Sequence, residues 1–304
     1  MIVSVCADKG APGVTTLATV LAMVWPTERV LLEADCSGGD LPFRLRHAHS
    51  DRGGGGGDNE RLLDPQPSVL ALAADARGPL PTGGLFGYAQ PSTLGVPVIA
   101  GALSPEAFSP MTRLWPQVAQ AAADWPGIVL ADLGRLHPGD PALPVAKASV
   151  AVLLLTRADL EGLYRLRDRV AELAGTLGDP SRPRHPVGVV VRARPGREAK
   201  AAMGQVQQLL ETAGSPIGVV GVFADDPGGE AGLRAGVVSR RLLGSELVRS
   251  GQALVEAVLS GWPQLHAPPT TPASPSIAPT GPVEVAVAES SDVAVANDSG
   301  QVSV

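Results

Sequence analysis

A short glycine-containing turn carries the residues that point most clearly to a chemical role. An apolar run over residues 2–7 leads directly into the sequence KGAPGVTT at residues 9–16. In such a strand-turn-helix segment, backbone N–H groups surround a phosphate, a lysine after the last glycine reaches the terminal phosphates, and the next Ser or Thr holds Mg²⁺. Thr15 supplies that hydroxyl, but Val14 stands at the lysine position. The segment therefore predicts a phosphate loop without its usual cation.

Lys9, which stands ahead of the glycines, gives this loop a particular resemblance. The segment resembles the deviant Walker A motif of the ParA/MinD family of partitioning and positioning ATPases, usually written K-G-G-x-G-K-[ST]-[ST]. Five residues of the motif are retained: Lys9, Gly10, Gly13, Thr15 and Thr16. Ala11 replaces the second glycine and Val14 the second lysine. Only three of the 24 Lys and Arg residues are lysines, which argues against coincidence at position 9.

The resemblance implies a nucleotide site that is shared between two subunits. In the family, the early lysine crosses a dimer interface to the nucleotide of the partner. It thus implies ATP and Mg²⁺ as cofactors, a nucleotide-dependent homodimer, and a catalytic role for Lys9. The loop residues implied to bind the nucleotide are Gly10, Ala11, Gly13, Val14, Thr15 and Thr16. Because a charged phosphate contact is missing at Val14, we expect weak ATP binding and very slow turnover.

Two further apolar segments end in acidic residues. Residues 30–40 run from a strand into Asp35 and a glycine-rich turn, and resemble the family's second strand motif, whose aspartate orients the attacking water. Glu33 stands where the family often has another aspartate. Residues 127–134 resemble a Walker B strand, which implies that Asp132 supports Mg²⁺ together with Thr15. The alternative for Asp35 is an acidic residue that merely begins a helix after a strand.

The segments expected beside the base depart from the family pattern. The strand at residues 188–191 is followed by Arg192, where relatives commonly have an Asn that reads adenine. A guanidinium can stack on a base but cannot reproduce the paired donor and acceptor of an amide. Asp225, in the loop at residues 223–228, lies where relatives also wrap the adenine. The resemblance implies that both residues contact the nucleotide.

Alternating strands and helices must position these residues. The hydrophobic pattern predicts strands at residues 30–35, 96–100, 127–132, 150–155, 187–191 and 217–223. Helices are predicted at residues 15–25, 68–76, 109–125, 160–173, 197–213 and 245–259. This order is typical of a doubly wound, mostly parallel sheet with helices on both faces, as in P-loop NTPases. The last helix carries Arg249 but no lysine, which favours core packing over a membrane anchor.

Length and composition predict one domain followed by a tail. Of 304 residues, 44% are hydrophobic, enough for a large core over residues 1–263. Residues 264–304 are Pro/Ser/Thr-rich and then acidic, which predicts a disordered tail, and five consecutive glycines predict a mobile loop at residues 46–60. No apolar run reaches the roughly 18 residues of a transmembrane helix, and no secretion signal is recognised. With two cysteines expected to be free thiols, a cytoplasmic protein is expected.

Three functions follow from these patterns. The first is a ParA/MinD-like spatial organiser or regulatory scaffold with a degenerate ATP site, a pseudo-ATPase that acts on an unidentified protein partner. The second is a slow active ATPase in DNA or plasmid partitioning, and the third is a nucleotide-free interaction module for a pilus or secretion machine. The net charge of −6 argues against a basic nucleic-acid surface, although arginines at residues 182–197 keep non-specific DNA binding open.

Overall fold

A computed structural model describes residues 1–9, 13–48, 61–81, 83–179, 181 and 184–266. Its centre is an eight-stranded sheet in the order β3-β4-β2-β5-β1-β6-β7-β8. The strands are β1 (Ile2–Ala7), β2 (Arg29–Glu33), β3 (Gln90–Pro91), β4 (Pro97–Ile99), β5 (Ile128–Arg135), β6 (Ala151–Arg157), β7 (Val187–Ala193) and β8 (Val219–Ala224). All neighbours pair in parallel except β3 and β4. The predicted doubly wound, mostly parallel sheet is therefore confirmed.

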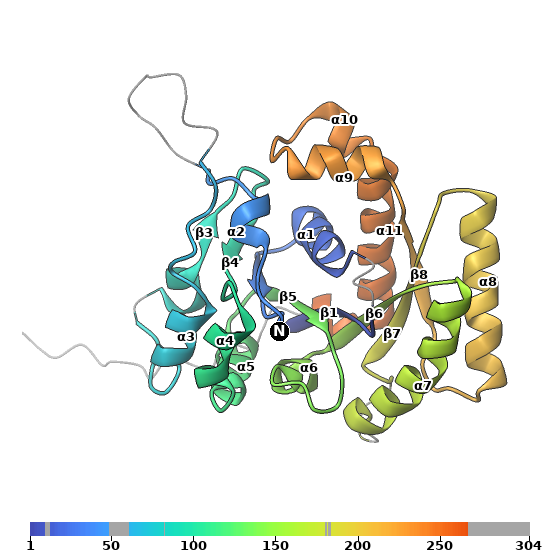
Figure 1. Cartoon of the computed structure of the whole chain (residues 1–304), viewed down its shortest axis with the longest axis horizontal. Helices are drawn as coiled ribbons and strands as arrows, with labels where there is room; N and C mark the ends of the chain where they lie inside the picture. Colours follow the sequence, from blue (N-terminus) through green and yellow to red (C-terminus); the bar gives the residue numbers. More distant parts are fainter. Residues whose placement is uncertain (10–12, 49–60, 82, 180, 182–183, 267–304) are drawn as a thin grey trace, which may run out of the picture. The chain divides into compact units, whose positions relative to one another are not determined.

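Helices cover both faces of the sheet (Figure 1). On one face lie α1 (Val14–Val24) and α11 (Glu246–Gly261). The opposite face is covered by α3 (Val69–Asp75), α5 (Trp115–Asp124), α6 (Leu143–Ala148), α7 (Leu160–Leu177) and α8 (Arg197–Thr212). Strand side chains alternate between the two cores, so that Ile2 and Cys6 join one and Val3 and Val5 the other. Burial on both faces explains why the central strands are continuously apolar.

The helix predicted at residues 109–125 is wrong in its first half. The structure has α4 (Pro105–Phe108), then a 3-10 turn, η3 (Ser109–Met111), and starts α5 only at Trp115. Pro116 therefore lies in the first turn of α5, where its missing N–H has no intrahelical partner to lose.

The predicted α11 is confirmed as a core helix, because Leu247, Leu254 and Val258 are each 1% exposed or less.

Short helices complete the chain. They are α2 (Leu41–Arg44), η2 (Gly84–Tyr88), α9 (Pro227–Arg234), α10 (Arg240–Leu243) and η4 (Pro263–His266). Among the described residues, no helix combines the length and apolar character needed to cross a membrane. The predicted mobile loop lies outside the described residues from position 49 onward, and the predicted tail from position 267 onward.

The strand order gathers the sequence-predicted residues at one edge of the sheet. The chain leaves β1 for β2 on one side, whereas it leaves β6 for β7 on the other. Neighbouring strands whose connections diverge in this way leave a crevice at their carboxyl ends, where α/β proteins bind ligands. The register places Asp132 of β5 beside both Val5 and Glu33. The loop after β1 and the acids after β2 and in β5 thus share one edge.

Candidate nucleotide site

The start of α1 has the geometry of an anion-binding helix end. Gly13 adopts a left-handed conformation, with φ 102° and ψ 35°, and no side chain caps the helix. The first N–H groups of α1, from Val14 to Thr16, therefore have no intrahelical partner and carry the positive end of the helix dipole. The predicted contacts of Gly10 and Ala11 lie outside the described residues. Backbone groups can therefore cradle a phosphate at this helix end.

Val14 cannot replace the cation of an intact loop. Its side chain is 3% exposed and belongs to the apolar core with Leu17 and Leu21 of the same helix. Only its backbone N–H is therefore available to a ligand. The nucleotide contact predicted for Val14 is reduced to this single group.

Asp132 lies directly beneath the helix start and has features of a metal-supporting residue. It is fully buried, and its Oδ1 accepts a hydrogen bond from the N–H of Gly134 at 3.0 Å. Its Oδ2 is buried without a hydrogen-bond partner in the described part of the chain. Burial raises the pKa of Asp132 to about 7, against the lowering effect of the neighbouring Thr15 hydroxyl. An unsatisfied carboxylate oxygen beside a hydroxyl fits the oxygen ligands and water shell of Mg²⁺.

Asp35 faces the same space. A Cβ placed on Gly134 would lie 1.9 Å from Oδ2 of Asp35, so the carboxylate packs directly on this glycine. Asp35 and Thr15 line one cavity of about 370 Å³ together with Arg44 and Arg135. Burial raises the pKa of Asp35, while the Ser37 hydrogen bonds and Arg135 lower it. The structure therefore places Thr15, Asp35 and Asp132 close together, and their roles toward a metal ion and a water molecule stay predictions.

Glu33 has a structural role that its position in the sequence did not reveal. It is 1% exposed, and its Oε1 accepts hydrogen bonds from the N–H groups of Asp40 at 2.7 Å and Leu41 at 2.8 Å. Its Oε2 accepts from the N–H of Gly101 at 2.8 Å. One carboxylate thereby fastens the loop after β2, the start of α2 and the loop after β4. Glu33 therefore supports the backbone beneath the site rather than facing a ligand.

Lys9 lies apart from the cavity of Thr15 and Asp35. It is exposed and borders a second cavity of about 260 Å³, between the end of β6 and the first turns of α7. Arg157 and Arg165 line this cavity as well. The preceding residue, Asp8, pairs with Arg169 of α7 at 2.5 Å. The negative charge of Asp8 is therefore balanced within its own subunit.

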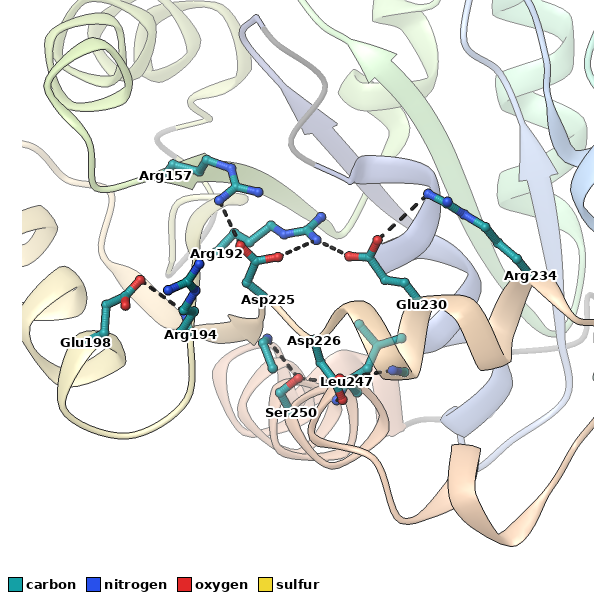
Figure 2. Close-up of polar contacts among 12 residues, drawn as sticks. Arg157, Arg192, Arg194, Glu198, Asp225, Asp226, Glu230, Arg234, Leu247 and Ser250 are labelled. Carbon is teal, nitrogen blue, oxygen red and sulfur yellow. Dashed lines mark hydrogen bonds and ion pairs between the residues drawn. The ribbon is translucent and has the colours of Figure 1, made fainter.

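Arg192 and Asp225 meet in an ion cluster, shown in Figure 2. Nη2 of Arg192 donates to Oδ1 of Asp225 at 2.9 Å and also contacts the carboxylate of Glu230 on α9. Nη1 of Arg157 lies 3.0 Å from Oδ2 of Asp225, and Nη2 of Arg234 lies 3.8 Å from Oε2 of Glu230. Burial favours the neutral acid, but the hydrogen bonds from Arg192 and Arg157 hold the pKa of Asp225 below its ordinary value. We call these five residues the Arg192 cluster.

No sequence pattern pointed to Glu230, Arg157 or Arg234 as members of this cluster. Glu230 and Arg234 lie one turn apart on α9, whereas Arg157 ends β6 and is brought to Asp225 by the order β6-β7-β8. The neighbouring Asp226, by contrast, is structural. It accepts from the N–H groups of Gly229 at 3.0 Å and Leu247 at 3.2 Å, and so links the starts of α9 and α11.

The fold of this chain is shared with proteins whose structures are solved. A ParA family ATPase from Chlorobium tepidum TLS superposes with a TM-score of 0.60 at 15% identity, over 84% of this chain and 98% of that one. The cell division ATPase MinD of Pyrococcus furiosus gives 0.59 at 19% identity, over 85% and 98%. The septum site-determining protein MinD of Pyrococcus horikoshii OT3, solved in complex with Mg-ADP, gives 0.59 at 18% identity, over 86% and 97%.

These likenesses cover almost the whole length of each relative. No protein-family model and no curated protein matches the sequence. The chain therefore has the fold of the ParA/MinD ATPases, and the evidence for this lies in its structure. The expected resemblance at the level of fold is confirmed.

Proposed function

We propose that this protein is a ParA/MinD-like spatial organiser that binds Mg-ATP weakly and hydrolyses it very slowly. The observation that carries the proposal is the meeting of Thr15, Asp35 and Asp132 at the uncapped start of α1, with a buried Val14 in place of the lysine. Solved proteins of this fold are partition and positioning ATPases, and one was solved with Mg-ADP. The site keeps the groups that bind phosphate and support a metal, but lacks a charge that intact loops provide.

Each retained group has a defined task in this proposal. Backbone N–H groups at the start of α1 hold phosphate oxygens, and Asp35 orients a water molecule. The Thr15 hydroxyl and Asp132 hold Mg²⁺, which supplies charge compensation for the phosphates. Without an ammonium at position 14, the chain loses transition-state stabilisation more than ground-state binding. The protein thus uses nucleotide binding, rather than rapid turnover, to change its assembly.

Dimerisation through the carboxyl edge of the sheet is the proposed response to nucleotide. Lys9 is exposed at this edge and is available to a second subunit. Leu160 and Tyr164, in the first turns of α7 after β6, are 86% and 65% exposed. Exposed large apolar side chains beside a cleft are typical of protein interfaces. We propose that a second copy covers this edge when Mg-ATP binds, and that the dimer recruits a protein partner.

Light scattering with and without Mg-ATP tests this proposal. We expect the wild-type mass to shift from monomer toward dimer, and Lys9→Ala to abolish the shift without changing the melting temperature. Lys147→Ala is the matched control, because Lys147 is an exposed lysine on α6. An unchanged mass for the wild type, or a normal ATP-dependent dimer of Lys9→Ala, would contradict the proposal and favour a nucleotide-free interaction module.

Phosphate release separates the organiser from an active partition ATPase. We expect a rate far below that of an intact relative measured alongside. A rate equal to that of the relative, abolished by Asp35→Ala, would favour the slow-ATPase alternative in DNA or plasmid partitioning. Non-specific DNA binding stays a prediction, to be tested by the salt dependence of the affinity.

A further inference from the structure

Arg192 is placed against the phosphate loop. A Cβ built on Gly13 would lie 1.9 Å from Nη1 of Arg192, so the guanidinium touches the backbone at the point where α1 begins. The Arg192 side chain is 6% exposed and reaches this point from the end of β7. The sequence motif cannot show this contact, because it covers only residues next to the loop in the chain.

This position is electrostatically unusual for a cation. The N-terminus of a helix is its positive end, where anions are favoured and cations disfavoured. The carboxylates of Asp225 and Glu230 offset this cost in the free protein (Figure 2). A phosphate bound at the first N–H groups of α1 would lie beside the same guanidinium. Its negative charge would be stabilised both by the helix N–H groups and by Arg192.

The charges of the Arg192 cluster allow such an exchange. The cluster holds three guanidinium groups and two carboxylates, an excess of one positive charge. Arg157 still pairs with Asp225, and Arg234 still lies beside Glu230, when Arg192 turns toward an anion. Asp225 and Glu230, whose side chains are 23% and 17% exposed, therefore each keep a neighbouring cation and some contact with solvent.

We propose that Arg192 is the phosphate-binding cation of this site and replaces, from β7, the lysine that Val14 removes from the loop. The inference rests on the proposed function, since it concerns the same nucleotide site. It also reassigns Arg192, which binds the phosphate chain rather than the base. A guanidinium presents a planar fork of donors that suits two phosphate oxygens at once, so Arg192 supplies part of the charge that the loop itself lacks.

Calorimetric titration with inorganic pyrophosphate, ATP and adenosine tests the inference on the full chain. Arg192→Gln removes the charge and keeps a side chain that can hydrogen-bond to Asp225, and Arg192→Lys keeps the charge without the fork. We expect Arg192→Gln to weaken pyrophosphate and ATP binding about 10- to 100-fold, and Arg192→Lys to lose less. Adenosine, which has no phosphate, should bind all three proteins equally.

Arg194→Gln is the matched control, because Arg194 is exposed and follows the same strand. It should bind all probes like the wild type, and melting curves confirm that each variant is folded. Tighter ATP binding by Arg192→Gln would mean that the guanidinium blocks the loop, and equal binding that it is only structural. Either result, or a wild type that binds neither pyrophosphate nor ATP, overturns the inference. Failure of the proposed function is read separately, as an unchanged mass in light scattering despite bound ATP.

Discussion

Glu33 holds three backbone segments beneath the candidate site, and its replacement by glutamine measures how much the site depends on this support. The two carboxylate oxygens accept from three N–H groups, those of Asp40, Leu41 and Gly101. A glutamine retains one acceptor oxygen. If that oxygen stays with Asp40 and Leu41, the amide NH₂ faces the N–H of Gly101, donor against donor.

The expected cost follows from these contacts. A buried donor left unsatisfied costs about 1–3 kcal/mol, and hydrogen bonds to a neutral amide are weaker than those to a carboxylate. Relief of the desolvation that raises the pKa of Glu33 offsets part of this loss. We therefore expect Glu33→Gln to lower the free energy of unfolding by about 2–4 kcal/mol. For a domain of this size, the melting temperature should fall by roughly 5–10 °C.

Urea denaturation at pH 7 without nucleotide measures the effect. The exposed Glu28 provides the control, since Glu28→Gln should change the free energy of unfolding by less than about 0.5 kcal/mol. If Glu33→Gln unfolds at the same urea concentration as the wild type, the three hydrogen bonds do not support the fold and the reasoning fails. If it is stable but does not bind ATP, Glu33 acts on the ligand rather than on the loops.

Three other predictions concern the rest of the domain. Because burial raises the pKa of Asp132 from its ordinary value of 3.8 to about 7, the folded state binds the extra proton between these values, so this residue's contribution to stability falls as pH rises through that window. Asp132→Asn should remove this pH dependence. In urea denaturation, the free energy of unfolding of the variant relative to that of the wild type should therefore be higher at pH 8 than at pH 4.5. The same difference in free energy at both pH values would contradict the raised pKa of Asp132. Val14→Lys should tighten Mg-ATP binding but lower the melting temperature of the free protein, because the position is 3% exposed and packs in the core, and calorimetry with thermal melting checks both. Removal of residues 267–304 should leave the melting temperature unchanged, because the truncated chain keeps Leu265, which is 3% exposed; a clear decrease would show that the tail contributes to stability.

The parts of the site that could be predicted are those encoded by short stretches of chain. The strand, turn and helix around Gly13 are contiguous, so their order alone predicts an anion-binding helix start. The proximity of Asp35 and Asp132 could be predicted because Asp35 follows one apolar strand and Asp132 lies in the carboxyl half of another, and parallel strands bring their carboxyl ends to one edge. The predicted end of the second strand at residue 132 is wrong, because β5 continues to Arg135. The start of α5 could not be placed correctly, because the apolar pattern of residues 109–125 is equally compatible with a turn that leads into Pro116.

Periodicity and motif spacing are local properties, so the fold class could be predicted from the chain alone, and the same local signals predict a phosphate loop without its lysine. The environment of each charge, in contrast, depends on how the elements pack. Glu33 can bind the loop after β4 because that loop lies beside the end of β2 in the sheet. Arg192 meets Gly13 because the end of β7 and α9 both lie close to the start of α1. Contacts between elements depend on strand order and packing, which no single stretch of sequence encodes. The guanidinium that contacts Gly13 therefore comes from a distant strand, which the motif could not show.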